Sequence, residues 1–141
     1  MLHDVVFLTH IVSAVVIMVV LVSMKLTAVA LVRGQGERVR FPQGQNFAAR
    51  TLHLIPLTGF AIAWASHSQR EPISLNQLWI TVGIVTYLLA AALLEIIVLP
   101  AERTLMVNGT ATASAKKMSG ALDGIMTMIV IATIAMLLQF G

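Results

Sequence analysis

Four apolar stretches, separated by short polar connections, run through this chain. They cover approximately residues 5–32, 48–65, 77–99 and 119–140. A helix of about 20 residues crosses a hydrocarbon core of about 30 Å, so each stretch is long enough, or nearly so, to span a membrane. The stretches are continuous and lack the alternation that membrane β-strands show. The pattern predicts an all-α integral membrane protein, an antiparallel bundle of four transmembrane helices in a single domain over residues 1–141.

Glycine and proline mark where these helices are expected to end. The first stretch, at 28 residues, is longer than the bilayer core requires, so its last turns are expected to project beyond the core. Gly34 and Gly36 follow it, as glycine follows many helix ends. Pro56 interrupts the second stretch, and Pro100 is expected to close the third, because proline removes a hydrogen bond from the helix.

Basic residues gather in the first and third connections, which predicts the orientation of the chain. The second connection contains only Arg70 beside Glu71, and the last residues carry no charged side chain. By the positive-inside rule, the first and third connections face the cytoplasm and both termini face the outer side. This topology accounts for the net charge of +3, so no nucleic-acid partner is expected. The basic residues are Arg33, Arg38, Arg40 and Arg50 in and beside the first connection, and Arg103, Lys116 and Lys117 in the third.

The composition narrows the classes of function. The chain is 58% hydrophobic and 11% charged, whereas a soluble domain has about a quarter of its residues charged. Cysteine is absent, which excludes disulfides, thiol nucleophiles and cysteine-ligated zinc or iron–sulfur centres. No Ser-His-Asp or metalloprotease pattern is present, and the short connections leave little room for a soluble catalytic domain. A non-enzymatic protein is favoured, although the sequence does not decide this.

Ionisable residues near one end of each stretch form a candidate inner polar cluster: Lys25, His53, Glu95 and Asp123. Hydropathy places all four near the cytoplasmic face. Ionisable side chains within spans are costly and often functional, so the cluster is a candidate proton relay or cation site. A structural role explains the same residues, because lysine extends to the interface and an aspartate is stabilised at a helix N-terminus. A Lys25–Glu95 pair would fit that role, and the sequence leaves both alternatives open.

Three histidines, His3, His10 and His67, are expected near the opposite face. His3 and His10 share one face of the first helix but lie about 10 Å apart along it, which is too far to bind one ion together. Imidazole is a common ligand of copper and haem iron, which makes these histidines candidate metal ligands, with His10 the deepest. Alternatively, His10 is a neutral histidine bonded to a serine or threonine of a neighbouring helix. His10 and His53 are expected about 15 Å apart in depth, so they are not expected to share one haem.

Several short motifs resemble those of a known group of membrane proteins. The first span contains Leu8-Thr9-His10-Ile11-Val12, the second contains Pro56-Leu57-Thr58-Gly59, and the third opens with Leu78-Trp79. Together with Lys116-Lys117 before the last span, these resemble the CopD-like copper-resistance membrane proteins and their small four-helix bacterial relatives. The HemJ-type protoporphyrinogen oxidases are similar more distantly. The resemblance implies a multi-pass protein of the bacterial inner membrane with periplasmic termini.

In this resemblance, His10 matches the first-span histidine, which in HemJ-type enzymes is linked to haem. Those enzymes also need a lysine shortly after the third-span tryptophan, whereas residues 80–83 here contain none. The leading expectation is therefore a haem- or copper-associated module, with haem b as the haem, or an accessory subunit of a larger membrane complex. Its expected partners are the lipid bilayer and either further copies of the chain or other membrane-protein subunits. The alternatives are proton- or cation-coupled transport by an oligomer through the inner polar cluster, and a HemJ-like membrane oxidoreductase.

Overall fold

The computed structural model describes residues 2–35, 45–67, 77–107 and 112–140. Within these ranges every regular element is helical, and no strand occurs. A 3-10 turn, Thr51–His53, separates α2 from α3, and a π-turn, Leu94–Val98, separates α4 from α5. The α-helices are α1 Leu2–Val32, α2 Gln45–Arg50, α3 Leu54–His67, α4 Leu78–Leu93, α5 Leu99–Val107 and α6 Thr112–Phe140.

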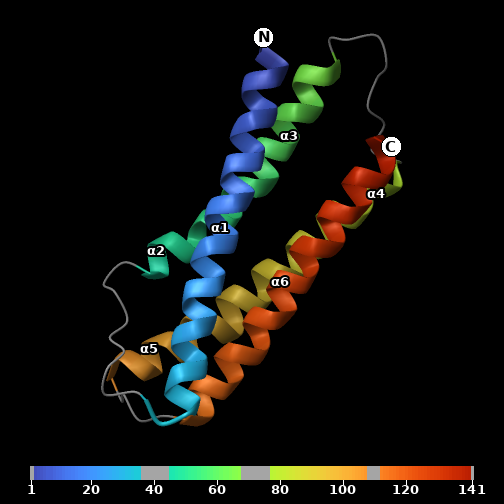
Figure 1. Ribbon diagram of the computed structural model, residues 1–141. Helices are drawn as coiled ribbons and strands as arrows, with labels where there is room; N and C mark the ends of the chain where they lie inside the picture. The colour runs from blue at the N-terminus through green and yellow to red at the C-terminus, as the bar shows by residue number, and fades with distance from the viewer. Residues whose placement is uncertain (1, 36–44, 68–76, 108–111, 141) are drawn as a thin grey trace.

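The long helices form two arms that meet at one end (Figure 1). α3 lies along the N-terminal half of α1, and α4 lies along α6; the C-terminal half of α1 packs on α6 and joins the arms. The arms diverge toward the other end of the molecule, where both termini lie. We call the two ends the packed end, which includes α5, and the open end.

The hydrophobic core lies at the packed end. On α1, Ile17, Leu21, Met24 and Ala28 are all fully buried. Their spacing of three or four residues places them on one face of the helix. They belong to one buried cluster with residues of the π-turn, α5 and α6. These are Leu94, Val98, Leu99, Met118, Leu122 and Ile125.

Toward the open end, large apolar side chains lie on the surface. Val5, Leu8 and Val12 of α1 and Leu137 of α6 each expose more than half of their area. Helices that are apolar on every face are typical of membrane spans. Three helical segments are long and apolar enough to cross a membrane, Asp4–Val32, Leu78–Val107 and Thr112–Leu138. The prediction of helices without strands is therefore confirmed for the described residues, and three of their helices have the length and composition that membrane spans need.

The second predicted stretch, 48–65, is broken into shorter pieces. The chain passes from α2 through the 3-10 turn into α3, which has 14 residues. Pro56 lies in the first turn of α3. Backbone N–H groups have no partner within the helix there, so a proline, which lacks an N–H, breaks no helical hydrogen bond. At this length α3 is shorter than the about 20 residues of an ordinary span. The four-span arrangement and its orientation stay predictions.

The expectation that Pro100 ends the third helix is wrong. The helix continues through Pro100 as α5 and ends at Val107. The π-turn lies immediately before the proline, and the Leu99 N–H bonds to the Leu94 carbonyl, five residues back. A proline within an α-helix collides with the carbonyl four residues earlier. A wider turn at that point accommodates the ring, so the chain keeps its direction.

Two other helix ends bear on the predicted site. α6 begins at Thr112, so Asp123 lies in its fourth turn and the expected interaction with a helix N-terminus is wrong. α1 ends as expected before Gly34, whose φ of 75° is in the left-handed region that favours glycine. The N–H groups of Gly34 and Gln35 bond to the carbonyls of Leu31 and Ala30, which is the hydrogen-bond pattern of a Schellman cap.

Candidate functional site

The predicted inner polar cluster divides into two separate groups. In the first, Lys25 of α1 contacts α6. Its Nζ lies 2.5 Å from Asp123 Oδ2, 2.8 Å from Ser119 Oγ and 3.1 Å from the Ser119 carbonyl. The Lys25–Glu95 pair, which the sequence left open, is therefore not formed. Three acceptors match the three protons of the ammonium group, so this group has the features of a structural anchor between α1 and α6.

The second group is a chain of hydrogen-bonded side chains around His53. Its Nδ1 lies 2.9 Å from Tyr87 Oη, and its Nε2 lies 3.4 Å from Glu95 Oε1. Arg50 Nε lies 3.7 Å from the same Glu95 oxygen. The His53 and Tyr87 rings meet edge to face with their centroids 6.1 Å apart. We call Tyr87, His53 and Glu95 the polar chain.

The acceptors of the polar chain determine where the His53 proton lies. An ionised Glu95 only accepts hydrogen bonds, so a neutral His53 donates to it from Nε2. Nδ1 then carries the lone pair and accepts the Tyr87 hydroxyl proton. The chain is thereby oriented to pass a proton from Tyr87 toward Glu95. Both Glu95 and His53 are partly exposed, with 42% and 37% of their side-chain area accessible, so that end of the chain is open at the surface of the bundle.

The two irregular turns of the backbone position the polar chain. His53 is the last residue of the 3-10 turn, and Glu95 lies in the π-turn. Single π-turns within helices occur frequently at functional sites. The sequence analysis did not select Tyr87. Its signal was that it is the only tyrosine in the chain and precedes Glu95 by about two helical turns.

His10 makes one side-chain hydrogen bond, to α3. Its Nδ1 lies 2.7 Å from Thr58 Oγ1, and the ring packs over Gly59. The Thr58 hydroxyl lies 3.0 Å from two backbone carbonyls, those of Leu54 and Ile55, which take its only proton. When that proton bonds to a carbonyl, the Thr58 oxygen accepts from His10 Nδ1, and Nε2 then carries the lone pair. The bond to a threonine is the one that the alternative, structural interpretation of His10 predicts.

The two halves of the bundle bring His10 and His53 closer in depth than expected. His10 contacts Thr58, which follows His53 by five residues. At the rise of an α-helix, this corresponds to about 7.5 Å along the helix axis. The expected separation in depth was about twice as large. The difference arises because α3 begins at Leu54, so its first turn, and not its middle, lies beside His10.

The remaining predicted ligands, His3 and His67, are not tested by the structure. His3 and His67 lie at the ends of α1 and α3, but their side chains are outside the described part of the structure. Among the described residues, no group of three or more His, Cys, Asp or Glu side chains could hold a metal ion. Arg38, Arg40, Arg70 and Glu71 of the predicted connections also lie outside the described residues.

Comparison with protein-family models, with curated proteins and with solved structures gives no match for this chain. The resemblance to CopD-like and HemJ-type proteins therefore stays a prediction.

Proposed function

We propose that this chain is a small multi-pass membrane module that holds a haem through His10. The observation that supports this most is the bond between His10 Nδ1 and Thr58, which fits a His10 that keeps Nε2 for a metal, on a helix long and apolar enough to cross a membrane. Histidines that bind metals almost always donate their other ring N–H to an oxygen acceptor, which fixes the ring and its tautomer. In this proposal the chain forms four antiparallel spans in the bacterial inner membrane, with both termini outside.

The donor set favours haem over copper. A porphyrin supplies four ligands of its own, so one histidine is enough to hold its iron. A copper ion has no such ligands and needs several protein donors, which the described residues do not bring together. His10 would supply one protein ligand to the iron. Any further protein ligand would come from another copy or a partner subunit, which is consistent with an accessory role in a larger complex.

Absorption spectra of the purified protein test this proposal. We expect protein purified from native membranes in mild detergent to show a Soret band, and sharp α-bands after dithionite reduction. His10→Ala should abolish these bands, whereas His53→Ala, which changes the other membrane-proximal histidine, should keep them. Thr58→Val should weaken haem binding by about 10- to 100-fold, because it removes the acceptor that orients the ring. A flat spectrum of wild-type protein that also fails to bind added haem would contradict the proposal.

A second candidate function is proton transfer through an oligomer, and the polar chain supports it. Tyr87, His53 and Glu95 connect the middle of α4 to a partly exposed carboxylate through two hydrogen bonds. In reconstituted vesicles, we expect Glu95→Gln to reduce proton flux at least about tenfold. The reason is that the glutamine amide accepts a proton poorly where the Glu95 carboxylate ends the polar chain. Asp123→Asn changes a carboxylate that lies outside the polar chain and should leave the flux unchanged. Equal flux in wild-type and Glu95→Gln vesicles would remove this candidate.

A further inference from the structure

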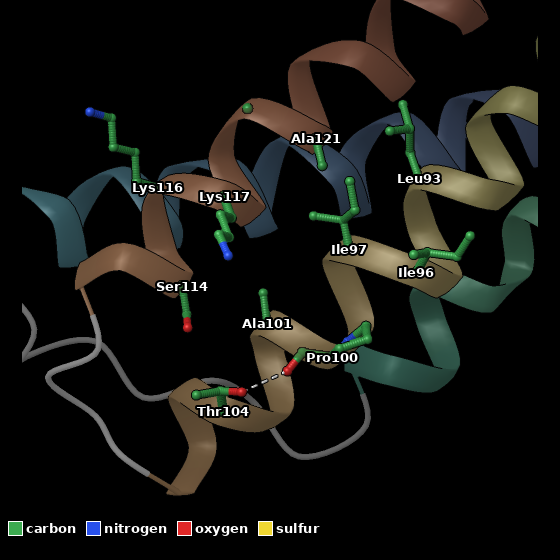
Figure 2. Close-up of a pocket in the computed structure, with 11 residues that line it drawn as sticks. Leu93, Ile96, Ile97, Pro100, Ala101, Thr104, Ser114, Lys116, Lys117 and Ala121 are labelled. Atoms are coloured by element: carbon green, nitrogen blue, oxygen red, sulfur yellow. Dashed lines mark hydrogen bonds between the residues drawn. The ribbon is translucent and has the colours of Figure 1, made fainter.

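A groove with two lysines at its edge lies at the packed end. It runs between α6 and the stretch from the end of α4 through the π-turn into α5. Its volume is about 710 Å³ (Figure 2). One side is formed by Leu93, Ile96, Ile97 and Pro100, and the other by α6 from Ser114 to Ala121. We call it the basic groove because Lys116 and Lys117 line it.

Small residues on α6 explain why the basic groove exists. At Gly124 the helices are in close contact, since a Cβ there would lie 2.9 Å from Leu93 Cδ1. One turn earlier, a Cβ at Gly120 would have no neighbour within 4 Å. The helices therefore touch at Gly124, whereas the face of α6 that carries Gly120 is open, although α6 still packs on the π-turn and α5. With glycine and alanine facing the wide π-turn, no side chain fills the space between them.

The two ends of the basic groove differ in chemistry. Leu93, Ile96 and Ile97 give one end an apolar wall, and Ile96 is 73% exposed. Lys116, Lys117 and Ser114 lie toward the other end, where Lys117 points down beside Ala101 (Figure 2). Within the described part of the chain, neither lysine forms an ion pair with a carboxylate. The groove thus offers the Lys117 cation next to an apolar wall, whereas the Lys116 side chain extends away from the groove (Figure 2).

We propose that the basic groove binds an anionic glycerophospholipid from the leaflet at the packed end. The phosphate would lie near Lys117, with Lys116 close enough on the rim to turn toward it, and an acyl chain would follow Leu93, Ile96 and Ile97. Basic pockets beside membrane helices bind anionic head groups in this way, because the lysines neutralise the phosphate while the apolar wall excludes water. This inference rests on the membrane placement in the proposed function, and it does not depend on haem binding at His10.

Native mass spectrometry of delipidated, full-length protein tests the proposal, with phosphatidylglycerol and phosphatidylcholine of identical acyl chains as probes. Wild-type protein should bind phosphatidylglycerol about tenfold more tightly or better. Replacing both lysines, Lys116→Gln with Lys117→Gln, should remove this preference, since each lysine near an anionic surface contributes about fivefold. Glycerol 3-phosphate, the head group without acyl chains, should not compete at the same concentration, which separates a lipid site from a phosphate site.

Two glycine variants separate the groove from a general surface effect. Gly120→Leu should fill the space and weaken binding of both lipids without disturbing the fold, because a Cβ there meets no neighbour. Gly83→Leu is the matched control: its Cβ also meets nothing within 4 Å, and it is far along α4 from the groove. Equal affinity for the two lipids, or unchanged binding by the lysine pair variant and Gly120→Leu, would overturn the proposal. His10→Ala protein should bind phosphatidylglycerol as wild type does, so loss of haem and loss of lipid binding are distinguished.

Discussion

Glu102 on α5 is a buried carboxyl group with one oxygen, Oε2, that lacks a hydrogen-bond partner among the described residues. Its side chain is 1% exposed. Leu99, Ala101 and Leu105 around it on the same helix are also buried. A buried polar group that lacks a partner costs about 1–3 kcal/mol in stability. The unpaired oxygen of Glu102 therefore lowers the stability of the core in which it lies.

The first prediction follows from this burial. Glu102→Met keeps nearly the same volume and removes the unpaired oxygen, so we expect it to raise the free energy of unfolding by about 1–3 kcal/mol. Glu102→Gln, which keeps two polar atoms in the same place, should gain less. The measurement is the equilibrium unfolding of the purified protein in detergent. A Met variant that is less stable than wild type would show that the carboxyl group has a partner that stabilises the fold.

The sequence identified most of the polar residues at this scale, but not which of them meet. Lys25 was predicted near a membrane face and lies at the packed end, yet its partner is Asp123 and not Glu95. Hydropathy gives the depth of a residue in the membrane but not the rotation of one helix against another. Which carboxylate a lysine contacts depends on that rotation. Tyr87 was missed for a related reason: its spacing from Glu95 is visible in the sequence, but its contact with His53 depends on how the helices pack.

The π-turn is the element that local sequence rules failed to predict. Proline was taken to end the third helix, because it cannot donate a hydrogen bond. The structure instead inserts a wider turn at Leu94–Val98 and continues to Val107. The side chains of this turn point in different directions. Glu95 lies on the side of His53, and Ile96 and Ile97 line the basic groove. One backbone irregularity thus contributes to both sites.

The contact between α4 and α6 gives the second prediction. Gly124 allows the close approach of Leu93, and a larger side chain would have to displace it. Gly124→Leu is expected to overpack this contact and to lower the stability by about 1–3 kcal/mol. Gly83→Leu makes the same chemical change in open space and should be neutral or slightly stabilising, since leucine favours helix more than glycine does. Thermal unfolding in detergent measures both, and equal losses in the two variants would contradict the close contact.

For the whole molecule, hydropathy predicted the class of protein but not its shape. Long apolar runs predicted helices that span a membrane, and three of them do have the length and composition to do so. The short α3 lies beside only the N-terminal half of α1, which leaves two arms that diverge (Figure 1). No sequence rule gives this divergence, since it depends on where the helices cross.

The last prediction concerns the number of membrane crossings. Both termini lie toward the open end (Figure 1), as an even number of crossings requires. If α3 crosses as a short fourth span, Gln35 and Ser114 face the cytoplasm while the C-terminus faces outward; if it does not, the two ends of the protein lie on opposite sides. The chain has no cysteine, so Gln35→Cys and Ser114→Cys each introduce a single label site. In intact cells, we expect both to resist a membrane-impermeant maleimide, and a C-terminal alkaline phosphatase fusion, active only outside the cytoplasm, to be active. Either cysteine reacting in intact cells, or an inactive fusion, would contradict the four-span topology.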